Sequence, residues 1–242
     1  MWFSCGAASA VAAKKAVETY RDKQVEVLYC DTLKYEHPDN SRFMADVQDW
    51  IGQEIKVLRS TKYADIMEVF RGKRFIVSSR SFAWCTDILK RQVRIDYSSP
   101  GDIHVFGMTA DEGKRIEHFE IQNSQIWPEW ILQTEGITKP DCYKILFEAG
   151  IELPAMYRLG YHNNNCIGCV KGGAGYWNKI RRDFPERFDE MARLDRELQT
   201  KMNIKIGPER ERVYLDELPP DAGRFHDEDI ECGTLCTGAV NS

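Results

Sequence analysis

The residues best suited to chemistry lie in one short stretch, Asn163–Gly173, which reads Asn-Asn-Asn-Cys-Ile-Gly-Cys-Val-Lys-Gly-Gly. Its cysteines, Cys166 and Cys169, form a Cys-x-x-Cys motif, in which a tight turn can aim both sulfurs at one metal ion or cluster. The glycines let backbone N–H groups approach a ligand closely, and Lys171 adds a positive charge. The three asparagines can contact a ligand through their amides or simply populate left-handed turn geometry. The stretch therefore predicts part of a binding site.

The chain contains eight cysteines, and two pairs of them are closely spaced, Cys166/Cys169 and Cys232/Cys236. In a reducing compartment such pairs indicate metal binding or catalysis rather than disulfides. Together with Cys85 they give five candidate ligands, and four thiolates suffice for a [4Fe–4S] cluster or for tetrahedral zinc. Redox-active or unligated thiols are the third alternative.

A second candidate site lies near the start of the sequence, where residues 2–9 read Trp-Phe-Ser-Cys-Gly-Ala-Ala-Ser. A short strand, a loop of small residues and a helix N-terminus make an anion site, since N–H groups and the helix dipole point at the ligand. Ser4, Cys5, Gly6 and Ser9 are the candidate phosphate contacts, because phosphate needs N–H and hydroxyl donors without bulky side chains. A tight strand–helix turn without a ligand is the alternative.

Asp31 and Thr32 follow a strand pattern, Gln24–Cys30, that becomes wholly apolar. Polar residues at the carboxyl end of such a strand face the usual ligand crevice, so this pair can bind a ribose, a nucleobase edge or Mg²⁺. A capped strand end is the alternative. Cys30, within the apolar run, and Cys142, on an apolar helix pattern, are expected to be inert core thiols.

Cys85 stands at the start of a predicted helix that also carries Lys90 and Arg91 within two turns. These two cations are candidates to neutralise a phosphate or sulfate, the lysine as a point charge and the arginine as a bidentate fork. Arg115 is a weaker candidate, for which ordinary solvated helix charge is the better interpretation.

The elements that must position these residues alternate between strand and helix. Strands are predicted at 2–3, 24–30, 54–59 and 102–108, with a further edge strand at 120–128. Helices are predicted at about 10–20, 41–51, 63–70, 109–119, 138–149 and 176–201, the last broken near Pro185. This alternation predicts an α/β fold with a doubly wound, mainly parallel sheet and helices on both faces. After residue 201 the pattern fades into an irregular tail, for which Cys232 and Cys236 are ready anchors.

The composition suits one large α/β domain or a domain with an appendage: 242 residues, of which 43% are hydrophobic and 29% charged. A net charge of −5 argues weakly against a general nucleic-acid-binding protein. No run approaches the roughly 18 apolar residues of a membrane span, and the first residues lack the basic region of a signal peptide. A cytoplasmic protein without a membrane attachment is therefore expected.

In their order, these motifs resemble the phosphoadenosine-phosphosulfate (PAPS) reductase family, within the adenine nucleotide alpha-hydrolase superfamily of PP-loop ATP-pyrophosphatases. Four segments carry the resemblance: the loop at 3–9, the Asp31-Thr32 strand end, Cys85-Thr-Asp-Ile-Leu-Lys90, and Arg158-Leu-Gly160-Tyr followed by Cys166-x-x-Cys169. They resemble the family's Ser-Gly-Gly-x-Asp-Ser phosphate loop, its Asp-Thr strand end, its Cys-x-x-x-x-Lys segment and its late nucleotide-binding turn with a cysteine pair. The resemblance covers roughly residues 1–200, and any one motif is loose whereas the ordered set is fairly specific.

The sequence departs from the family at both ends. Cys5 replaces the first glycine of the loop, and Ala8 stands where ATP-pyrophosphatases carry Asp, which argues against an ordinary ATP-adenylating loop. The family's C-terminal Glu-Cys-Gly-Leu-His is only half reproduced, since Glu231-Cys232-Gly233 continues as Thr-Leu-Cys236. The role of Cys232, as a nucleophile or as a metal ligand, is therefore open.

The resemblance implies a nucleotide-binding α/β domain at 1–200 and a tail at 201–242 that folds back on the site. The implied ligand is PAPS, adenylyl sulfate (APS) or ATP, with Mg²⁺ as a further candidate. Its implied contacts are Ser4, Cys5, Gly6, Ser9, Asp31, Thr32, Arg91, Arg158, Gly160 and Lys171. The implied reaction is reduction of a sulfonucleotide to sulfite, in which Cys232 or Cys236 attacks sulfur, with Lys90 beside it. A thiol donor such as a thioredoxin-like protein then releases sulfite from the cysteine thiosulfonate.

Family members with clusters combine an early cysteine with a later Cys-x-x-Cys, here Cys85 with Cys166 and Cys169, and the tail would supply the fourth ligand. The rival set is the two close pairs, Cys166/Cys169 and Cys232/Cys236, a spacing that zinc favours. Two other functions remain open. One is an ATP-dependent sulfurtransferase with an iron–sulfur cluster, of the tRNA-thiolation or DNA-phosphorothioation type, which alone implies a nucleic-acid partner. The other is a catalytically degenerate nucleotide-binding module; a homodimer is compatible with each.

Overall fold

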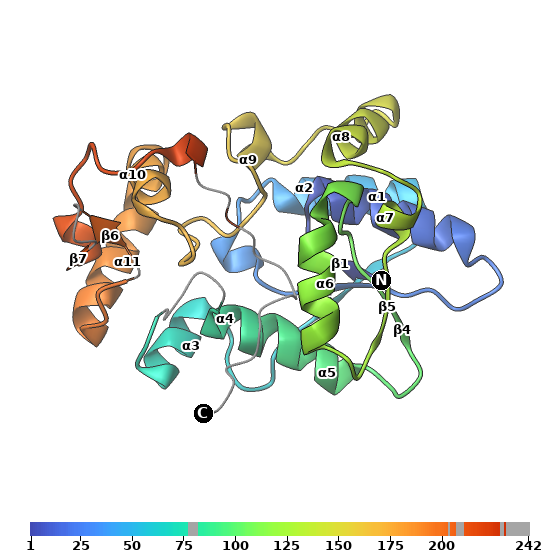
Figure 1. Ribbon diagram of the computed structural model, residues 1–242, viewed down its shortest axis with the longest axis horizontal. Coiled ribbons are helices and arrows are strands. Elements are labelled where there is room, and N and C mark those ends of the chain that lie inside the picture. The colour runs from blue at the N-terminus through green and yellow to red at the C-terminus, as the bar shows by residue number, and fades with distance from the viewer. Residues whose placement is uncertain (77–81, 203, 207–210, 228–229, 231–242) are drawn as a thin grey trace. The chain divides into compact units, whose positions relative to one another are not determined.

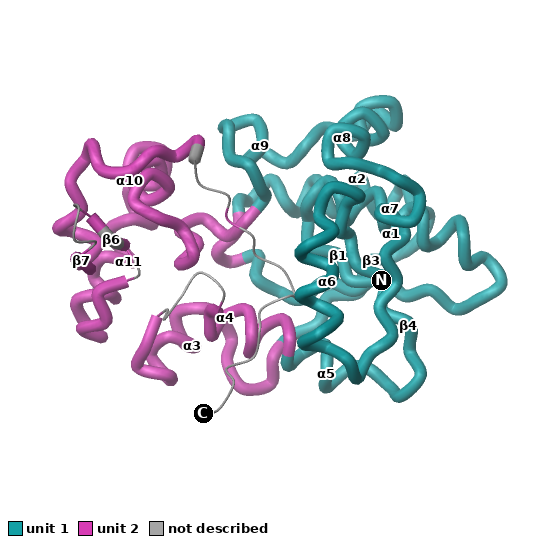
Figure 2. The backbone as a smooth tube through the Cα atoms, viewed as in Figure 1, with its two compact units in different colours: residues 1–33, 37–59, 92–164 teal, residues 34–36, 60–91, 165–242 magenta. Residues whose placement is uncertain are grey.

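The computed structural model describes the chain except for residues 77–81, 203, 207–210, 228–229 and 231–242 (Figure 1). The backbone divides into two compact units, each assembled from separate stretches of sequence (Figure 2). Unit 1 comprises residues 1–33, 37–59 and 92–164, and unit 2 comprises residues 34–36, 60–91 and 165–242. The domain boundary expected near residue 200 stays a prediction.

The strands of unit 1 are short and parallel. β1 (Trp2–Phe3), β2 (Val27–Cys30) and β3 (Ile55–Leu58) form one sheet in the order β1-β2-β3. β4 (Ile103–Val105) and β5 (Trp127–Glu129) form a second parallel pair. A parallel bridge between Trp2 and Phe106 lies between the two groups of strands. The expected α/β class with parallel strands is confirmed.

The helices of unit 1 are α1 (Ala7–Thr19), α2 (Asn40–Ile51), α5 (Val93–Tyr97), α6 (Gly113–Gln122), α7 (Ile131–Thr134), α8 (Lys139–Glu148) and α9 (Ala155–Arg158), with a 3₁₀ turn at Ala110–Glu112. α1 packs against α2, α7 and α8 (Figure 1). Its sequence explains this central place, because the run 10–13, Ala-Val-Ala-Ala, is fully buried and small side chains let neighbouring backbones come close. These residues join β1–β3, α2 and α8 in one apolar core.

Aromatic residues form a separate packing cluster around β4 in unit 1. The Phe106 and Phe119 rings lie 4.9 Å apart edge to face, and Trp130 stacks 5.5 Å from Phe106. The buried Arg94 guanidinium lies 5.6 Å from the centre of the Phe106 ring, a cation–π distance. These contacts hold the residue that follows β4 against α6 and the start of α7.

Unit 2 is mainly helical. Its helices are α3 (Ile66–Lys73), α4 (Trp84–Thr86), α10 (Ala174–Asp183) and α11 (Pro185–Leu198). The predicted break at Pro185 is confirmed, because proline lacks the N–H that would continue the helix and is well placed in a first turn. The remaining elements are the antiparallel pair β6 (Lys205–Ile206) and β7 (Glu211–Arg212), and 3₁₀ turns at Leu215–Glu217 and Phe225–Asp227. A 3₁₀ turn at Leu33–Tyr35 and a π-helical segment at Asp87–Gln92 belong partly to each unit.

The tail of unit 2 is anchored by polar side chains of α10 and α11. The Asn178 amide donates to the carbonyls of Pro219 and Ala222, both at 2.8 Å. Asp195, which is fully buried, accepts a hydrogen bond from the Leu215 N–H at 3.0 Å. The sequence pattern did not predict this attachment of the earlier part of the tail. The expected anchors, Cys232 and Cys236, lie outside the described residues.

The structure differs from two expectations about local structure, one in the bounds of a strand and one in the kind of helix. The edge strand predicted at 120–128 is Trp127–Glu129 instead, because α6 continues to Gln122 and the Asn123 N–H closes it by donating to Phe119. The helix predicted from Cys85 begins at Trp84 and passes into the π-helical segment, whose wider turns have no signature in residue spacing.

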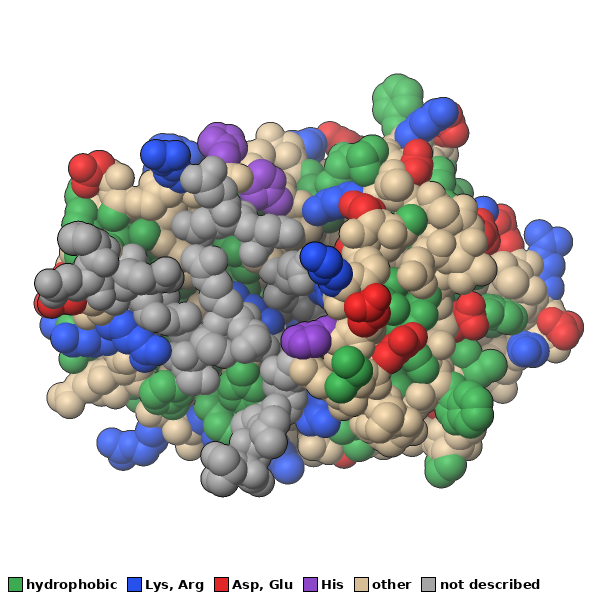
Figure 3. All heavy atoms as spheres, in the orientation of Figure 1, with side chains coloured by type: hydrophobic (Ala, Val, Ile, Leu, Met, Phe, Trp, Pro, Cys, Tyr) green, Lys and Arg blue, Asp and Glu red, His purple; other side chains and the backbone are tan. Residues whose placement is uncertain are grey.

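None of the helices in the described part of the chain is both long and apolar enough to cross a bilayer. On the face shown in Figure 3, hydrophobic side chains are interspersed with charged ones.

Candidate functional site

The predicted phosphate loop of unit 1 joins β1 to α1 and is organised by one hydroxyl. Ser9 Oγ accepts hydrogen bonds from the Ser4 N–H at 3.1 Å, the Ser4 hydroxyl at 3.2 Å and the Gly6 N–H at 3.3 Å. It donates to the Gly6 carbonyl at 2.9 Å. The structure thus brings Ser4, Gly6 and Ser9 together, as the sequence predicts. Cys5 adopts a positive φ of 55° and its side chain is fully buried, so it can meet a ligand only through its backbone.

Three residues outside the loop, Asn40, Tyr157 and Asn164, hold it in place. The Asn164 amide donates to the Cys5 carbonyl at 2.6 Å and to Asn40 Oδ1 at 2.9 Å. The Tyr157 hydroxyl accepts from the Ala7 N–H at 3.4 Å and from the Asn164 backbone, and burial raises the pKa of Tyr157. Asn164 Oδ1 is buried and accepts no hydrogen bond from any residue that the structure describes. Only Asn164 carried a signal in the sequence, as one of three consecutive asparagines.

Gly107, just after β4, lies directly against the start of α1. A Cβ atom at this position would be 2.6 Å from Ser9 Cα and 2.8 Å from Ser9 N, so no side chain fits there. The carboxyl ends of β1 and β4 therefore meet at the first turn of α1. By helix geometry the amides of that turn have no acceptor inside the helix. The Ala7 N–H donates to the Tyr157 hydroxyl, so a ligand there would use the amides that follow it.

Asp31 and Thr32 follow β2, as predicted, and both have protein partners. Asp31 pairs with Arg59 at 2.9 Å and accepts from the Leu33 N–H at 3.2 Å, which is an Asx turn. The Thr32 hydroxyl lies 3.3 Å from the Tyr29 hydroxyl and is buried. The capped strand end that the sequence offered as an alternative is therefore present, and a ligand contact by the half-buried Asp31 stays a prediction.

Arg158 and Gly160 also lie in unit 1. Arg158 pairs with Glu152 at 2.9 Å and with Asp39 at 3.3 Å. The Arg42 hydrogen bonds are the main cause that lowers the pKa of Asp39 to about 2. Gly160 has a φ of 79° at the end of α9, where a left-handed residue is needed. Both residues have a structural explanation, and a role in nucleotide binding stays a prediction.

The other predicted cations belong to unit 2. Lys90 is buried within the π-helical segment, and Arg91 forms an ion pair with Asp87 at 3.2 Å. Lys171 is buried just after the Cys-x-x-Cys motif. π-Helical turns are frequent at functional sites, and this one carries the second part of the Cys-x-x-x-x-Lys segment, from Asp87 to Lys90, whereas Cys85 lies in α4. Arg115, the weaker candidate, pairs with Glu112 in unit 1, in line with ordinary helix charge.

The Cys-x-x-Cys motif of unit 2 forms a turn that the Tyr176 hydroxyl holds. This hydroxyl accepts from the N–H groups of Gly168 at 3.1 Å and Cys169 at 2.9 Å, and it donates to the Cys166 carbonyl at 3.1 Å. Gly168 has a φ of 80°, which a side chain would strain. The Ile167 N–H donates to the Tyr35 carbonyl at 2.7 Å. The motif is therefore a formed turn, as the sequence predicts.

The five candidate metal ligands are only partly described. Cys166 and Cys169 are buried and Cys85 is half-buried, whereas Cys232 and Cys236 lie outside the described residues. Within the described ranges, no three His, Cys, Asp or Glu residues form a group suited to a metal ion. The donor set of the turn thus fits two positions of a four-thiolate site, and the choice between the two predicted sets stays open.

One contact brings the tail to this turn. The Asn165 amide donates to the Ile230 carbonyl at 2.6 Å, and Ile230 is itself buried. Asn165 directly precedes Cys166, and Ile230 comes two residues before Cys232. The tail is thus fixed beside the Cys-x-x-Cys turn at the last point described before its cysteines. Cys142, by contrast, is a core residue as predicted, and burial raises its pKa to about 12.

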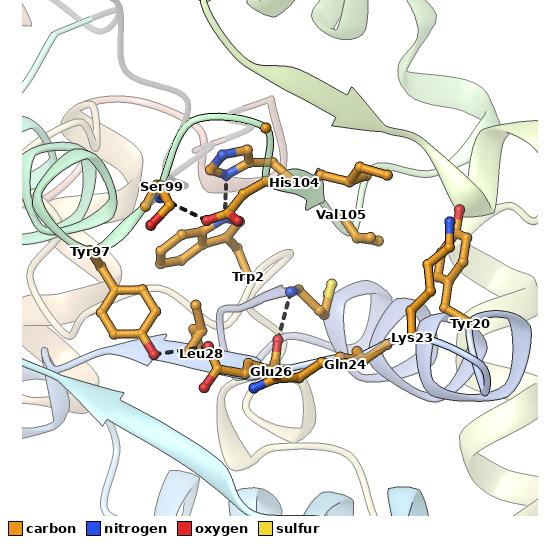
Figure 4. Close-up of a pocket in the computed structure, with 16 residues that line it drawn as sticks. Trp2, Tyr20, Lys23, Gln24, Glu26, Leu28, Tyr97, Ser99, His104 and Val105 are labelled. Atoms are coloured by element: carbon orange, nitrogen blue, oxygen red, sulfur yellow. Dashed lines mark hydrogen bonds between the residues drawn. The ribbon is translucent and has the colours of Figure 1, made fainter.

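A cavity of about 670 Å³ lies in unit 1 at the opposite, amino ends of β1, β2 and β4 (Figure 4). Trp2, Tyr20, Glu26, Tyr97 and His104 are among its lining residues, and none of the predicted site residues is. His104 Nδ1 accepts from the Trp2 indole N–H at 2.9 Å. Its pKa is lowered to about 4, chiefly by burial and then by Arg94. No motif in the sequence pointed to this cavity.

Unit 1 therefore offers a loop suited to an anion, with an acidic residue at the next strand end, and unit 2 offers a pair of thiols on a rigid turn. Comparison of the chain with protein-family models, with curated proteins and with solved structures found no match.

Proposed function

We propose that this chain is an adenine-nucleotide-binding enzyme of sulfur metabolism, which reduces a sulfonucleotide to sulfite through a cysteine thiosulfonate. The observation that carries the proposal is the loop between β1 and α1, which Ser9 Oγ orders by accepting from the Ser4 and Gly6 N–H groups. A loop of small residues at a helix N-terminus suits a phosphate, because it lets the anion approach the positive end of the helix dipole. We propose that Asp31, at the end of the neighbouring β2, accepts from a ribose hydroxyl.

The strand order of unit 1 supports this location. If the Trp2–Phe106 bridge joins the two parallel groups into one sheet, the order is β3-β2-β1-β4-β5. This is the order of a doubly wound sheet with helices on both faces, in which the direction of winding reverses between β1 and β4. Ligands of such sheets bind outside the carboxyl ends of the strands at that reversal. The loop after β1 and Gly107 after β4 flank that point.

The thiol chemistry is assigned to unit 2. The Asn165–Ile230 hydrogen bond supports a role for the tail, because it holds the chain two residues before Cys232 and one residue from Cys166. We propose Cys166 and Cys169 as metal ligands, with Cys85 or the tail completing the set around a [4Fe–4S] cluster or a zinc ion. When bound, such a group would link the turn to the segment that supplies its other ligands.

In the proposed reaction, the thiolate of Cys232 or Cys236 attacks the sulfur of the sulfonucleotide. An S–S bond forms and the bond from sulfur to the phosphate oxygen breaks, so the nucleotide monophosphate leaves with the electron pair. A dithiol donor then attacks the cysteine sulfur, releases sulfite with its electron pair, and is itself oxidised to a disulfide. Lys90, with Arg91 and Lys171, is proposed to neutralise the charge of the sulfonate and phosphate.

Nucleotide binding is tested by comparing two glycine substitutions in unit 1. In Gly107→Ala the new Cβ would lie 2.6 Å from Ser9 Cα, so the loop must shift, whereas at Gly113 a Cβ meets nothing within 4 Å. Calorimetric titration with APS, PAPS and ATP should show at least tenfold weaker binding, on the order of 1.4 kcal/mol, for Gly107→Ala alone. Equal affinities in both variants, at unchanged thermal stability, would contradict a nucleotide site at this loop.

The chemical step is tested with sulfonucleotide labelled in its sulfur atom. The wild-type chain should acquire label that a reducing thiol releases as sulfite, and Cys232→Ser or Cys236→Ser should abolish this labelling. Sulfite release that persists in the double variant refutes the nucleophile assignment. If the protein instead consumes ATP and never acquires label, the sulfurtransferase hypothesis takes its place.

A further inference from the structure

The Tyr176 hydroxyl makes three hydrogen bonds to the Cys-x-x-Cys turn. A phenol has one proton to donate and two lone pairs to accept with. Here the proton goes to the Cys166 carbonyl at 3.1 Å, and the lone pairs accept from the Gly168 N–H at 3.1 Å and the Cys169 N–H at 2.9 Å. A single side chain therefore ties together the first, third and fourth residues of the motif.

The packing of α10 leaves this side chain little freedom. Tyr176 is only 2% exposed, and a Cβ at Gly172 would lie 2.1 Å from its Cδ1, so glycine is required for the ring to fit. The neighbouring Trp177 ring packs against the turn itself, since a Cβ at Gly168 would be 3.2 Å from its Cη2. The ring position, and with it the hydroxyl, is set by a buried helix rather than by anything bound at the cysteines.

These hydrogen bonds bear on how the thiols can act. The N–H groups of the third and fourth residues of the motif both donate to this phenol. Among the described residues, a protein hydroxyl thus closes the turn, and a metal ion would not have to order it.

We propose that Tyr176 is the positioning residue of the thiol pair, which pre-forms the turn in the metal-free chain so that Cys166 and Cys169 can bind one metal ion. This inference rests on the proposed function in taking the two cysteines as metal ligands. Outer groups of this kind orient ligands, and their removal typically weakens metal binding about 10- to 100-fold. Tyr176→Phe keeps the ring and removes only the hydroxyl, so it isolates this effect.

The first test is a titration of the metal-free full-length chain with Co²⁺, followed through the thiolate-to-cobalt charge-transfer absorption and by competition with a chelator. Tyr176→Phe should weaken binding at least tenfold. The matched control is Tyr35→Phe, which removes another buried tyrosine hydroxyl of unit 2 but keeps the Tyr35 carbonyl that accepts from Ile167. This control should stay within about threefold of wild type. Equal affinity of Tyr176→Phe and wild type overturns the inference.

The second test needs no variant and applies even if Tyr176→Phe fails to fold. Hydrogen exchange of the metal-free wild-type chain should show the Gly168 and Cys169 amides protected to the same degree as the amides of α10. Rapid exchange at both amides would overturn the inference, because the turn would then be open without metal. Absence of the charge-transfer band from the wild-type titration would also overturn it, whereas nucleotide binding by unit 1, measured separately, decides the proposed function.

Discussion

The buried His104 gives the protein a stability that depends on pH in a defined window. Its imidazole is 4% exposed, and burial, reinforced by Arg94 and only partly opposed by Asp102, lowers its pKa from 6.5 to about 4. The unfolded chain takes up a proton at this side chain as the pH falls through 6.5, whereas the folded chain takes it up only near pH 4. Unfolding is therefore favoured progressively as the pH falls from 6.5 to 4.

The magnitude follows from the difference between the two pKa values. A pKa lowered from 6.5 to about 4 corresponds to about 3 kcal/mol, at about 1.4 kcal/mol for each pKa unit. The carboxyl of Asp39, whose pKa is lowered to about 2, loses its contribution to the unfolding free energy mainly below pH 4. It therefore changes the pH dependence between pH 7 and pH 4 only slightly. Between pH 7 and pH 4 we expect His104 to account for about 3 kcal/mol of lost unfolding free energy.

The assay is urea denaturation at several pH values, for wild type and for His104→Gln. Glutamine is neutral throughout, and its amide oxygen can still accept from the Trp2 indole N–H. The free energy of unfolding of His104→Gln should fall by about 3 kcal/mol less than that of wild type between pH 7 and pH 4. Parallel curves for the two proteins would refute the reasoning, since the imidazole would then titrate alike in the folded and unfolded chains.

Three further substitutions should lower the free energy of unfolding in urea. Gly223→Ala should lower the free energy of unfolding by about 2 kcal/mol more than Gly101→Ala. Both glycines have a positive φ, 78° and 93°, but only at Gly223 would a Cβ meet backbone, at 2.2 Å. Equal losses in the two variants would contradict this reasoning. Asp195→Asn should lower the free energy of unfolding by about 2 kcal/mol, since one amide oxygen cannot replace a buried carboxylate that accepts three hydrogen bonds. An unchanged midpoint of urea denaturation would show that these bonds are dispensable. Tyr157→Phe should lower the free energy of unfolding by about 2 kcal/mol and weaken nucleotide binding, because it leaves the buried N–H groups of Ala7 and Asn164 without their acceptor. The control Tyr143→Phe should leave nucleotide binding unchanged.

The sequence predicted those features of the structure whose signals lie in neighbouring residues. The small residues at 4–9 predicted a loop between strand and helix, and the apolar run before Asp31 predicted a buried parallel strand. Both expectations hold because strand and turn signals reside in neighbouring residues. The same reason explains why Cys142 could be assigned to the core from helical spacing alone.

The supporting residues could not be predicted, because their roles depend on tertiary contacts. Tyr157 reaches the loop across 150 positions of sequence, and Gly107 is required only because α1 happens to pack against it. Tyr176 is near the Cys-x-x-Cys motif in sequence, but nothing in its spacing shows that its hydroxyl turns back onto that motif. The wide π-helical turns at Asp87–Gln92 likewise depend on packing, and an ordinary helix was the natural expectation there.

The division of the backbone has a consequence for synthesis on the ribosome. The chain passes through six segments that alternate between the two units, and unit 1 takes its last residues from the segment that ends at 164. All parts of unit 1 are therefore synthesised before the Cys-x-x-Cys turn. Unit 2, in contrast, begins with residues 34–36 and 60–91, which must wait for α10 and α11 before they gain their partners. We expect unit 1 to fold earlier during translation, and unit 2, with its thiols, to close only after α10 and α11 have emerged.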